Sequence, residues 1–427
     1  MSMSESPGMG LPARRYRWVL VALAIMAFFL FVPKTPGSAC IQIIRFAQAV
    51  EVPLNCDSRL LAKLYRNAET YFTDFNNWKG RPVFFVYGVF AAPVMEAVAV
   101  PLWTAVGGTA VSDRKVSHYR TYFSLHLAYY ALNVAVVLLT IWMAFNLVGL
   151  AASSGLALAL AASIASTDLV HGSVWLAHTN IYNLLAAIAC AFFVRLGWQT
   201  RETEPGTVLA WMAGAGLMLL VYPLFVILLP AFLSGVVLRG LFGRQTGAPF
   251  LLSVPVAGLA VLLFVLPLLG WNLAVRTLFA TDVYLTAQYG QFVWLVDAYR
   301  AGTLASAMAD NALTFFNTLG LHLNLFETVP VLVACAALVL FGDRSRLRAS
   351  DPVLIAIAIA LIGVLAFNYL QGYYAARLQV SVVALLFLLL ARIALLTGGV
   401  RLGGLVLVGV TVVQLIDAAT SYSLSAA

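Results

Sequence analysis

The stretch WVLVALAIMAFFLFV, residues 18–32, has no charged side chain and is long enough to cross most of a bilayer as a helix. Apolar runs of about 17 to 25 residues recur from here to the end of the chain, and they are continuous, not alternating. The 427 residues are 62% hydrophobic and 10% charged, with a mean hydropathy of +0.94, which excludes an ordinary soluble domain. Because only helices fit such runs in lipid, the sequence predicts one all-α, polytopic transmembrane domain over residues 1–427.

The basic residues stand in short clusters between the apolar runs. We therefore interpret them as topology signals and not as a nucleic-acid surface, despite a net charge of +8. Placing every cluster in the cytoplasm, including residues 114–120 and Arg195, requires about eleven spans in a cell membrane, with the N-terminus in the cytoplasm. The expected spans are 18–33, 82–106, 121–149, 181–198, 206–221, 223–240, 250–270, 327–341, 353–369, 377–397 and 402–420.

This topology leaves two long polar segments, residues 34–81 and 271–326, on the outer face. The apolar segment 155–170 does not fit as a full span, because it would move Arg195 out of the cytoplasm. We expect it to form a half-inserted helix at the outer face.

The first outer segment combines two expected surface helices with two cysteines. Apolar residues recur at helical spacing within 41–47 and 60–68, which predicts two short amphipathic helices at the membrane surface. Cys40 and Cys56 would form a disulfide in an oxidising compartment, and two free thiols are the alternative.

Several stretches occur in an order that is found in one family. CDSRLLAKLYRNAE (56–69) precedes RPVFFVYGVFAAPV (81–94), and HTNIYNLLAAIACAFFVRLGW (178–198) precedes WMAGAGLMLLVYPLFVILLPAFL (211–233) and YYAARLQVSVVALLFLLLAR (373–392). This series covers most of the chain and resembles the GT-C superfamily of lipid-linked-sugar glycosyltransferases. The resemblance is to the branch of the protein mannosyltransferases and the aminoarabinose transferase of lipid A.

Two positions depart from the pattern of this family. Asp57 is followed by Ser58, where the family often has an adjacent acidic pair. Tyr222 stands before Pro223, where the family usually has a basic residue.

The resemblance implies an integral membrane enzyme that moves a sugar from a polyprenyl-phosphate donor to a lipid or glycan acceptor on the periplasmic or other extracytoplasmic face. Such a transfer needs a carboxylate to deprotonate the acceptor hydroxyl, a cation to hold the departing phosphate, and an apolar groove for the prenyl tail. We expect no cofactor, and a divalent metal ion is the less favoured alternative.

For the general base, the resemblance and the outer position of the first segment lead us to rank Asp57 first, Asp74 second and Glu69 third. Asp57 also suits the N-cap of a surface helix, and the two roles are compatible. The alternative for Asp74 is a loop turn with Asn76 and Asn77.

For the phosphate, Arg377 is the first candidate, because a guanidinium can hold phosphate oxygens in a bidentate way. It follows Tyr373 and Tyr374 at the outer start of an expected span, and Arg276 occupies a similar position at the end of another. The alternative for these residues is an interfacial anchor, since aromatic and basic side chains both settle at headgroup depth.

His171, His178 and Asn180 lie on the expected outer turn and are candidates for substrate contact. Satisfied polar packing is the alternative. The two histidines have only Asp168 as a nearby acid, so the sequence does not supply a third metal ligand of the usual kind.

Two other functions remain open. A lipid or small-molecule transporter or flippase would show internal repeats and broken helices near the midplane, whereas the polar residues here cluster toward the outer face. The departures at Asp57 and Tyr222 also leave room for a catalytically inactive GT-C-like subunit.

Overall fold

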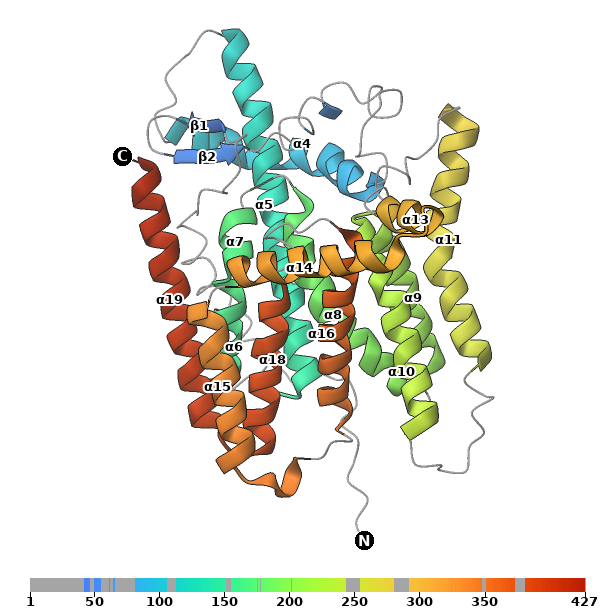
Figure 1. The fold of residues 1–427 in the computed structure, drawn as a ribbon. Helices are drawn as coiled ribbons and strands as arrows, with labels where there is room; N and C mark the ends of the chain where they lie inside the picture. Colours follow the sequence, from blue (N-terminus) through green and yellow to red (C-terminus); the bar gives the residue numbers. More distant parts are fainter. Residues whose placement is uncertain are drawn as a thin grey trace.

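The structure is a computed structural model, and helices make up most of the part of the chain that it describes (Figure 1). This confirms the predicted class, a helical and polytopic membrane protein. The described residues are 42–46, 50–54, 61, 64–65, 81–105, 113–150, 155–174, 176, 178–200, 202–242, 254–279, 292–323, 325–347, 351–372 and 381–426.

The helices follow the apolar runs and the polar turns between them. Their bounds are α4 Pro82–Ala105, α5 Asp113–Val148, α6 Gly155–Ala165, α7 Asp168–Ser173, α8 Tyr182–Trp198, α9 Pro205–Leu219, α10 Leu228–Phe242, α11 Val254–Phe279, α13 Val293–Arg300, α14 Leu304–His322, α15 Leu325–Phe341, α16 Pro352–Gln371, α18 Ser381–Leu396 and α19 Val400–Ala426. Short 3-10 turns are η2 Thr179–Ile181, η3 Pro223–Ile227 and η6 Arg344–Arg346.

Seven described helical segments are long and apolar enough to cross a membrane, or eight if the bent pair α14–α15 counts as one span. Three of the apolar helices, α6, α9 and α18, are shorter than a full crossing. The described part therefore supports fewer spans than the eleven expected, and the expected span at 18–33 lies outside it.

A β-hairpin replaces the first expected surface helix, so that prediction is wrong. Strands β1 (Gln42–Phe46) and β2 (Val50–Leu54) pair antiparallel, with Ile44 opposite Val52. Each strand has two β-branched residues among its five, and such residues favour extended backbone over helix. Pro53 is tolerated because both strands of a two-stranded sheet are edges.

Helices α5 and α8 run in the same direction, contrary to the expected topology. Arg195, near the end of α8, donates from Nη1 to the carbonyl oxygens of Asn146 (2.7 Å) and Leu147 (2.9 Å), near the end of α5. Both helices thus finish at one end of the bundle, so residues 114–120, at the start of α5, lie at the opposite end from Arg195. The prediction that both basic clusters face the cytoplasm is wrong.

We call this the lower end, where α8 ends at Trp198 and α16 begins at Pro352. The upper end is where α8 begins and where α16 ends at Gln371. Helices α6 and α7 lead from the end of α5 back to the start of α8, so the segment 155–170 connects the two ends of the bundle (Figure 1). The expectation that this segment lies half-inserted at one face is therefore wrong.

Helices α13 and α14 lie across the bundle, and α15 then runs along it (Figure 1). The bend between α14 and α15 is 94°. Two hydrogen bonds hold the crosswise helices on the end of α16, from Trp294 Nε1 to the Leu370 carbonyl (3.0 Å) and from the Tyr369 hydroxyl to the Met308 carbonyl (2.6 Å). Part of the second outer segment, 271–326, thus packs on the upper part of α16.

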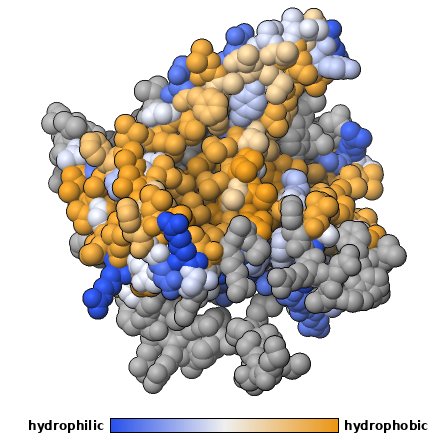
Figure 2. All heavy atoms as spheres, turned by 60° about the horizontal axis from the view of Figure 1, so that its bottom comes forward, coloured by the Kyte–Doolittle hydropathy of each residue, from blue (hydrophilic) through white to orange (hydrophobic). Residues whose placement is uncertain are grey.

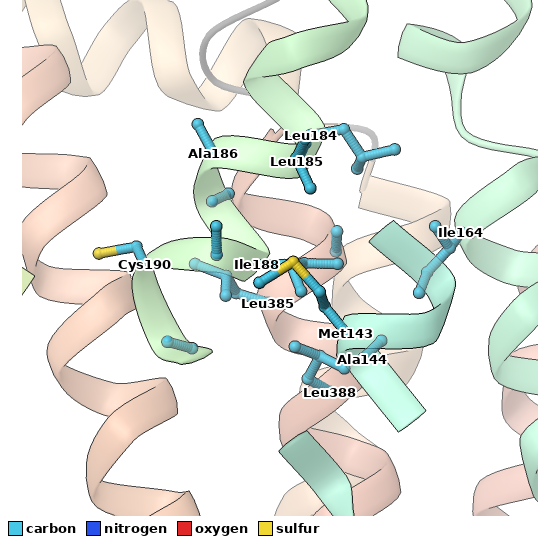
Figure 3. Close-up of a cluster of buried hydrophobic side chains, with 14 of the residues drawn as sticks. Met143, Ala144, Ile164, Leu184, Leu185, Ala186, Ile188, Cys190, Leu385 and Leu388 are labelled. Atoms are coloured by element: carbon cyan, nitrogen blue, oxygen red, sulfur yellow. The ribbon is translucent and has the colours of Figure 1, made fainter. Parts of the chain in front are cut away.

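Helix α8 forms the centre of the core, with 89% of the segment Thr179–Trp198 buried. Gly197 and Gly235 let α8 and α10 approach closely, because a Cβ at either position would overlap a carbonyl oxygen of the other helix. Figure 3 shows side chains of α5, α6, α8 and α18 meeting in this core, among them Met143, Ala144, Ile164, Leu185, Ile188, Leu385 and Leu388.

The outer surface of the bundle is apolar, as lipid requires. Only 11% of the segment Val254–Leu278 in α11 is buried, and Figure 2 shows hydrophobic residues over much of the described surface. A soluble protein rarely exposes apolar patches of this extent, so the surface supports a membrane location.

Candidate functional site

Most residues selected from the sequence as catalytic, phosphate-binding or disulfide-forming lie outside the part of the chain that the structure describes. These are Asp57, Glu69, Asp74, Tyr373, Tyr374, Arg377, Cys40 and Cys56. Their roles remain predictions.

The described residues of the second expected surface helix are Leu61, Leu64 and Tyr65, and all three are helical. Leu61 and Leu64 are buried in the main hydrophobic core, and Tyr65 packs against it. Burial and, to a smaller extent, the Glu96 carboxylate of α4 raise the pKa of the Tyr65 phenol. The apolar face predicted for this helix therefore contacts the membrane domain.

His178 and Asn180 meet at η2, and α7, which carries His171, is in contact with η2 at the upper end. The His178 side chain caps η2: its Nδ1 accepts a hydrogen bond from the Asn180 backbone N–H (3.1 Å). Both histidines are buried, with 2% and 4% of their surfaces exposed. His178 thus has a structural role, and its Nδ1 is unprotonated in this hydrogen bond.

Two further asparagines, which the sequence analysis did not select, shape the same turn. Asn133 of α5 donates from Nδ2 to the carbonyl oxygens of Ser173, Val174 and Leu176, with the last two at 2.9 Å. Asn183, in the first turn of α8, donates to the Asn180 carbonyl (2.8 Å). Both side chains are fully buried, and neither Oδ1 atom has a hydrogen-bond partner among the described residues.

Arg81 joins three elements beside this turn. It immediately precedes α4, and its Nη1 donates to the hydroxyl oxygen of Thr179 in η2 (2.8 Å). Its Cζ also lies 5.1 Å from the centre of the Tyr222 ring, just before η3. The backbone N–H of Val83 donates to the Leu220 carbonyl (3.2 Å), which fixes the start of α4 on the same turn.

Aromatic side chains line the region next to Arg81. The Phe84 ring stacks on Tyr129 with centroids 4.4 Å apart and meets Tyr182 edge-on at 6.1 Å. Tyr182 in turn meets Phe225 of η3 at 6.2 Å. The Tyr129 hydroxyl donates to the Phe84 carbonyl (2.8 Å), so α4, α5, α8 and η3 are held together in one aromatic cluster.

Arg276 is not part of this arrangement. It lies exposed in the last turn of α11, and Figure 1 shows α11 and α7 on opposite sides of the bundle. Among the described residues, no group of three or more His, Cys, Asp or Glu side chains could hold a metal ion.

Sequence reasoning missed Arg81, Asn133 and Asn183. The signal for Arg81 was a single cation directly before Pro82, where an apolar helix begins. Asn133 and Asn183 are polar residues within apolar runs, and buried polar residues in a membrane helix need a partner. Comparison with known protein families, with characterised proteins and with solved structures found no match for this chain.

Proposed function

We propose that this protein is a membrane-embedded glycosyltransferase that binds a polyprenyl-phosphate sugar at the upper end of the bundle and transfers the sugar to a lipid or glycan acceptor. The position of Arg81 against Tyr222 carries the proposal. The resemblance to GT-C enzymes implies a cation directly before Pro223, where this chain has Tyr222. Arg81 supplies a cation to this turn from another helix.

We place the upper end outside the cytoplasm, because the GT-C resemblance puts the reacting face there. The described basic residues are divided between the two ends, so they do not set this orientation. Arg195, Arg239, Arg344, Arg346, Arg392 and Arg401 lie at the lower end, and Arg81, Arg114, Lys115, Arg120 and Arg276 lie at the upper end. The count of about eleven spans, with residues 18–33, α9 and α18 included, belongs to the same proposal.

In the proposed reaction, Arg81 and Arg377 hold the phosphate of the donor. Asp57 takes the proton of the acceptor hydroxyl as its oxygen attacks the anomeric carbon. The bond from that carbon to the phosphate oxygen breaks, and polyprenyl phosphate leaves with the bonding electrons. The apolar surface of the bundle accommodates the prenyl tail.

The test compares the purified wild-type protein with Arg81→Ala and Asp57→Asn, and uses Arg239→Ala, at the lower end of the bundle, as a matched control. Thermal stabilisation by polyprenyl phosphate and native mass spectrometry report binding, and transfer from a panel of polyprenyl-phosphate sugars reports catalysis. We expect Arg81→Ala to bind the lipid more weakly, Asp57→Asn to bind it without transfer, and the control to match the wild type.

Other outcomes separate the competing functions. Lipid binding without transfer by the wild type would indicate an inactive GT-C-like subunit. Movement of the lipid across vesicle membranes without sugar transfer would indicate a flippase. Full transfer activity of Asp57→Asn would overturn the assignment of the base.

A further inference from the structure

A chain of buried polar side chains joins α15, α19 and α6 away from the site described above. Gln414 of α19 donates from Nε2 to Oε2 of Glu327 in α15 (3.0 Å). The Ser166 hydroxyl, at the end of α6, donates to Oε1 of Gln414. Glu327 is 3% exposed, and Gln414 and Ser166 are fully buried.

The direction of these hydrogen bonds favours a carboxylate at Glu327. The Gln414 amide oxygen accepts a hydrogen bond from Ser166, so the amide NH2 group of Gln414 faces Glu327 and donates to it. Glu327 also lies in the first turn of α15, where the helix dipole stabilises negative charge. Burial in apolar surroundings opposes both effects, because it favours the neutral acid. The hydrogen bonds and the burial therefore act in opposite directions on the charge of Glu327.

The network lies next to two connections between helices. Glu327 follows the 94° bend between α14 and α15, and Ser166 lies two residues before α7, which carries His171. A hydrogen bond to a charged acceptor is about twice as strong as one to a neutral acceptor. Protonation would therefore weaken the link between the bend and α6.

We propose that Glu327 is a proton-binding site whose protonation loosens the start of α15 from α19 and α6. This role is independent of the glycosyltransferase proposal. The other titratable or charged groups on the elements around Glu327 are Cys335 on α15, Asp310 and His322 on α14, Asp417 and Arg401 on α19, Arg392 on α18, and Asp168 and His171 on α7. Helix α6 carries none.

The first measurement is infrared difference spectroscopy of the protein in nanodiscs between about pH 5 and about pH 9, the range in which buried carboxyl groups titrate. We expect a protonated-carboxyl band that grows as the pH falls, that Glu327→Gln abolishes and that the control Asp417→Asn retains. The proposal would be overturned if Glu327→Gln kept the protonated-carboxyl band with the same midpoint pH. It would also be overturned if the wild type showed no such band.

Hydrogen–deuterium exchange tests the structural consequence. After correction for chemical exchange, the wild-type amides of residues 325–331 should exchange several-fold faster at the low-pH end, whereas Glu327→Gln should show no pH dependence. Ser166→Ala is the second variant, for use if Glu327→Gln does not fold. It keeps the Glu327 carboxyl group but removes the hydrogen bond that Ser166 donates to Oε1 of Gln414. An unchanged midpoint and exchange profile in Ser166→Ala would also contradict the proposal.

Discussion

The Cζ atom of Arg81 lies 5.1 Å from the centre of the Tyr222 ring, although the two residues come from turns far apart in the sequence. The same guanidinium donates to Thr179. The start of α4, the turn before α8 and the turn between α9 and α10 are thus joined by one cation at the upper end of the bundle.

Replacing Arg81 should weaken the binding of polyprenyl phosphate more than it weakens the fold. A hydrogen bond to a charged group contributes about 1.5 to 3 kcal/mol, so Arg81→Ala should raise the Kd about 10- to 100-fold. Arg81→Lys should recover part of the affinity, because it keeps the charge but not the planar fork. Binding is measured by native mass spectrometry, and an effect of the distant Arg276→Ala equal to that of Arg81→Ala would contradict the proposed site.

Alanine at Gly197 or Gly235 should destabilise the packing of α8 on α10. A new Cβ at Gly197 would overlap the Phe232 carbonyl oxygen, and one at Gly235 would overlap that of Val194. We expect a loss of about 1 to 3 kcal/mol in the free energy of unfolding, which is typical of overpacking. Gly214 in α9 is the control, because no neighbouring atom lies within 4 Å of the place that a methyl group would occupy. Gly214→Ala should therefore be neutral or stabilising. Thermal unfolding of the purified variants measures these differences.

Arg392 should matter far more for stability than Arg239. Arg392 forms an ion pair with Asp351, with Nη2 and Oδ2 2.5 Å apart, and both side chains are largely buried. Arg392 also donates to the Val148 carbonyl (3.0 Å). Arg392→Ala should lower the free energy of unfolding by about 2 to 4 kcal/mol, because it leaves a partly buried carboxylate without its cation.

The matched comparison is Arg239→Ala. Arg239 pairs with the exposed Glu202 at 2.9 Å, and surface pairs contribute at most about 1 kcal/mol. Equal losses in the two variants, measured by chemical unfolding in detergent micelles, would show that the Arg392–Asp351 pair stabilises the fold no more than a surface pair does.

Asn133→Leu should open the turn that carries His178 and Asn180. The substitution removes the donor shared by the Ser173, Val174 and Leu176 carbonyls, at about 1 kcal/mol for each well-formed bond. Hydrogen exchange should therefore rise over residues 173–180 and stay unchanged in α10.

The control for this experiment is Asn317→Leu, on the exposed side of α14. An identical exchange map for both variants would count against this role of Asn133.

The sequence by itself determined the class of the protein and most helix positions. Continuous apolar runs must form helices in lipid, since every backbone polar group has to be satisfied within the segment. The bounds of α8 (Tyr182–Trp198) and α16 (Pro352–Gln371) accordingly lie close to the expected spans 181–198 and 353–369. Helical spacing also predicted the buried face of residues 61–65, where Leu61 and Leu64 enter the core.

Other features depended on which segments meet, and only the tertiary structure decided them. Charge counting cannot give the direction of α5, because Arg195 acts in the fold as a partner of the α5 carbonyls and not only as a topology signal. Residues 42–46 form a strand because residues 50–54 pair with them, and helical spacing in a short segment carries no information about a partner. The links from Arg81 to Tyr222 and from Glu327 to Gln414 likewise join distant helices, so no local pattern of residues could have revealed them.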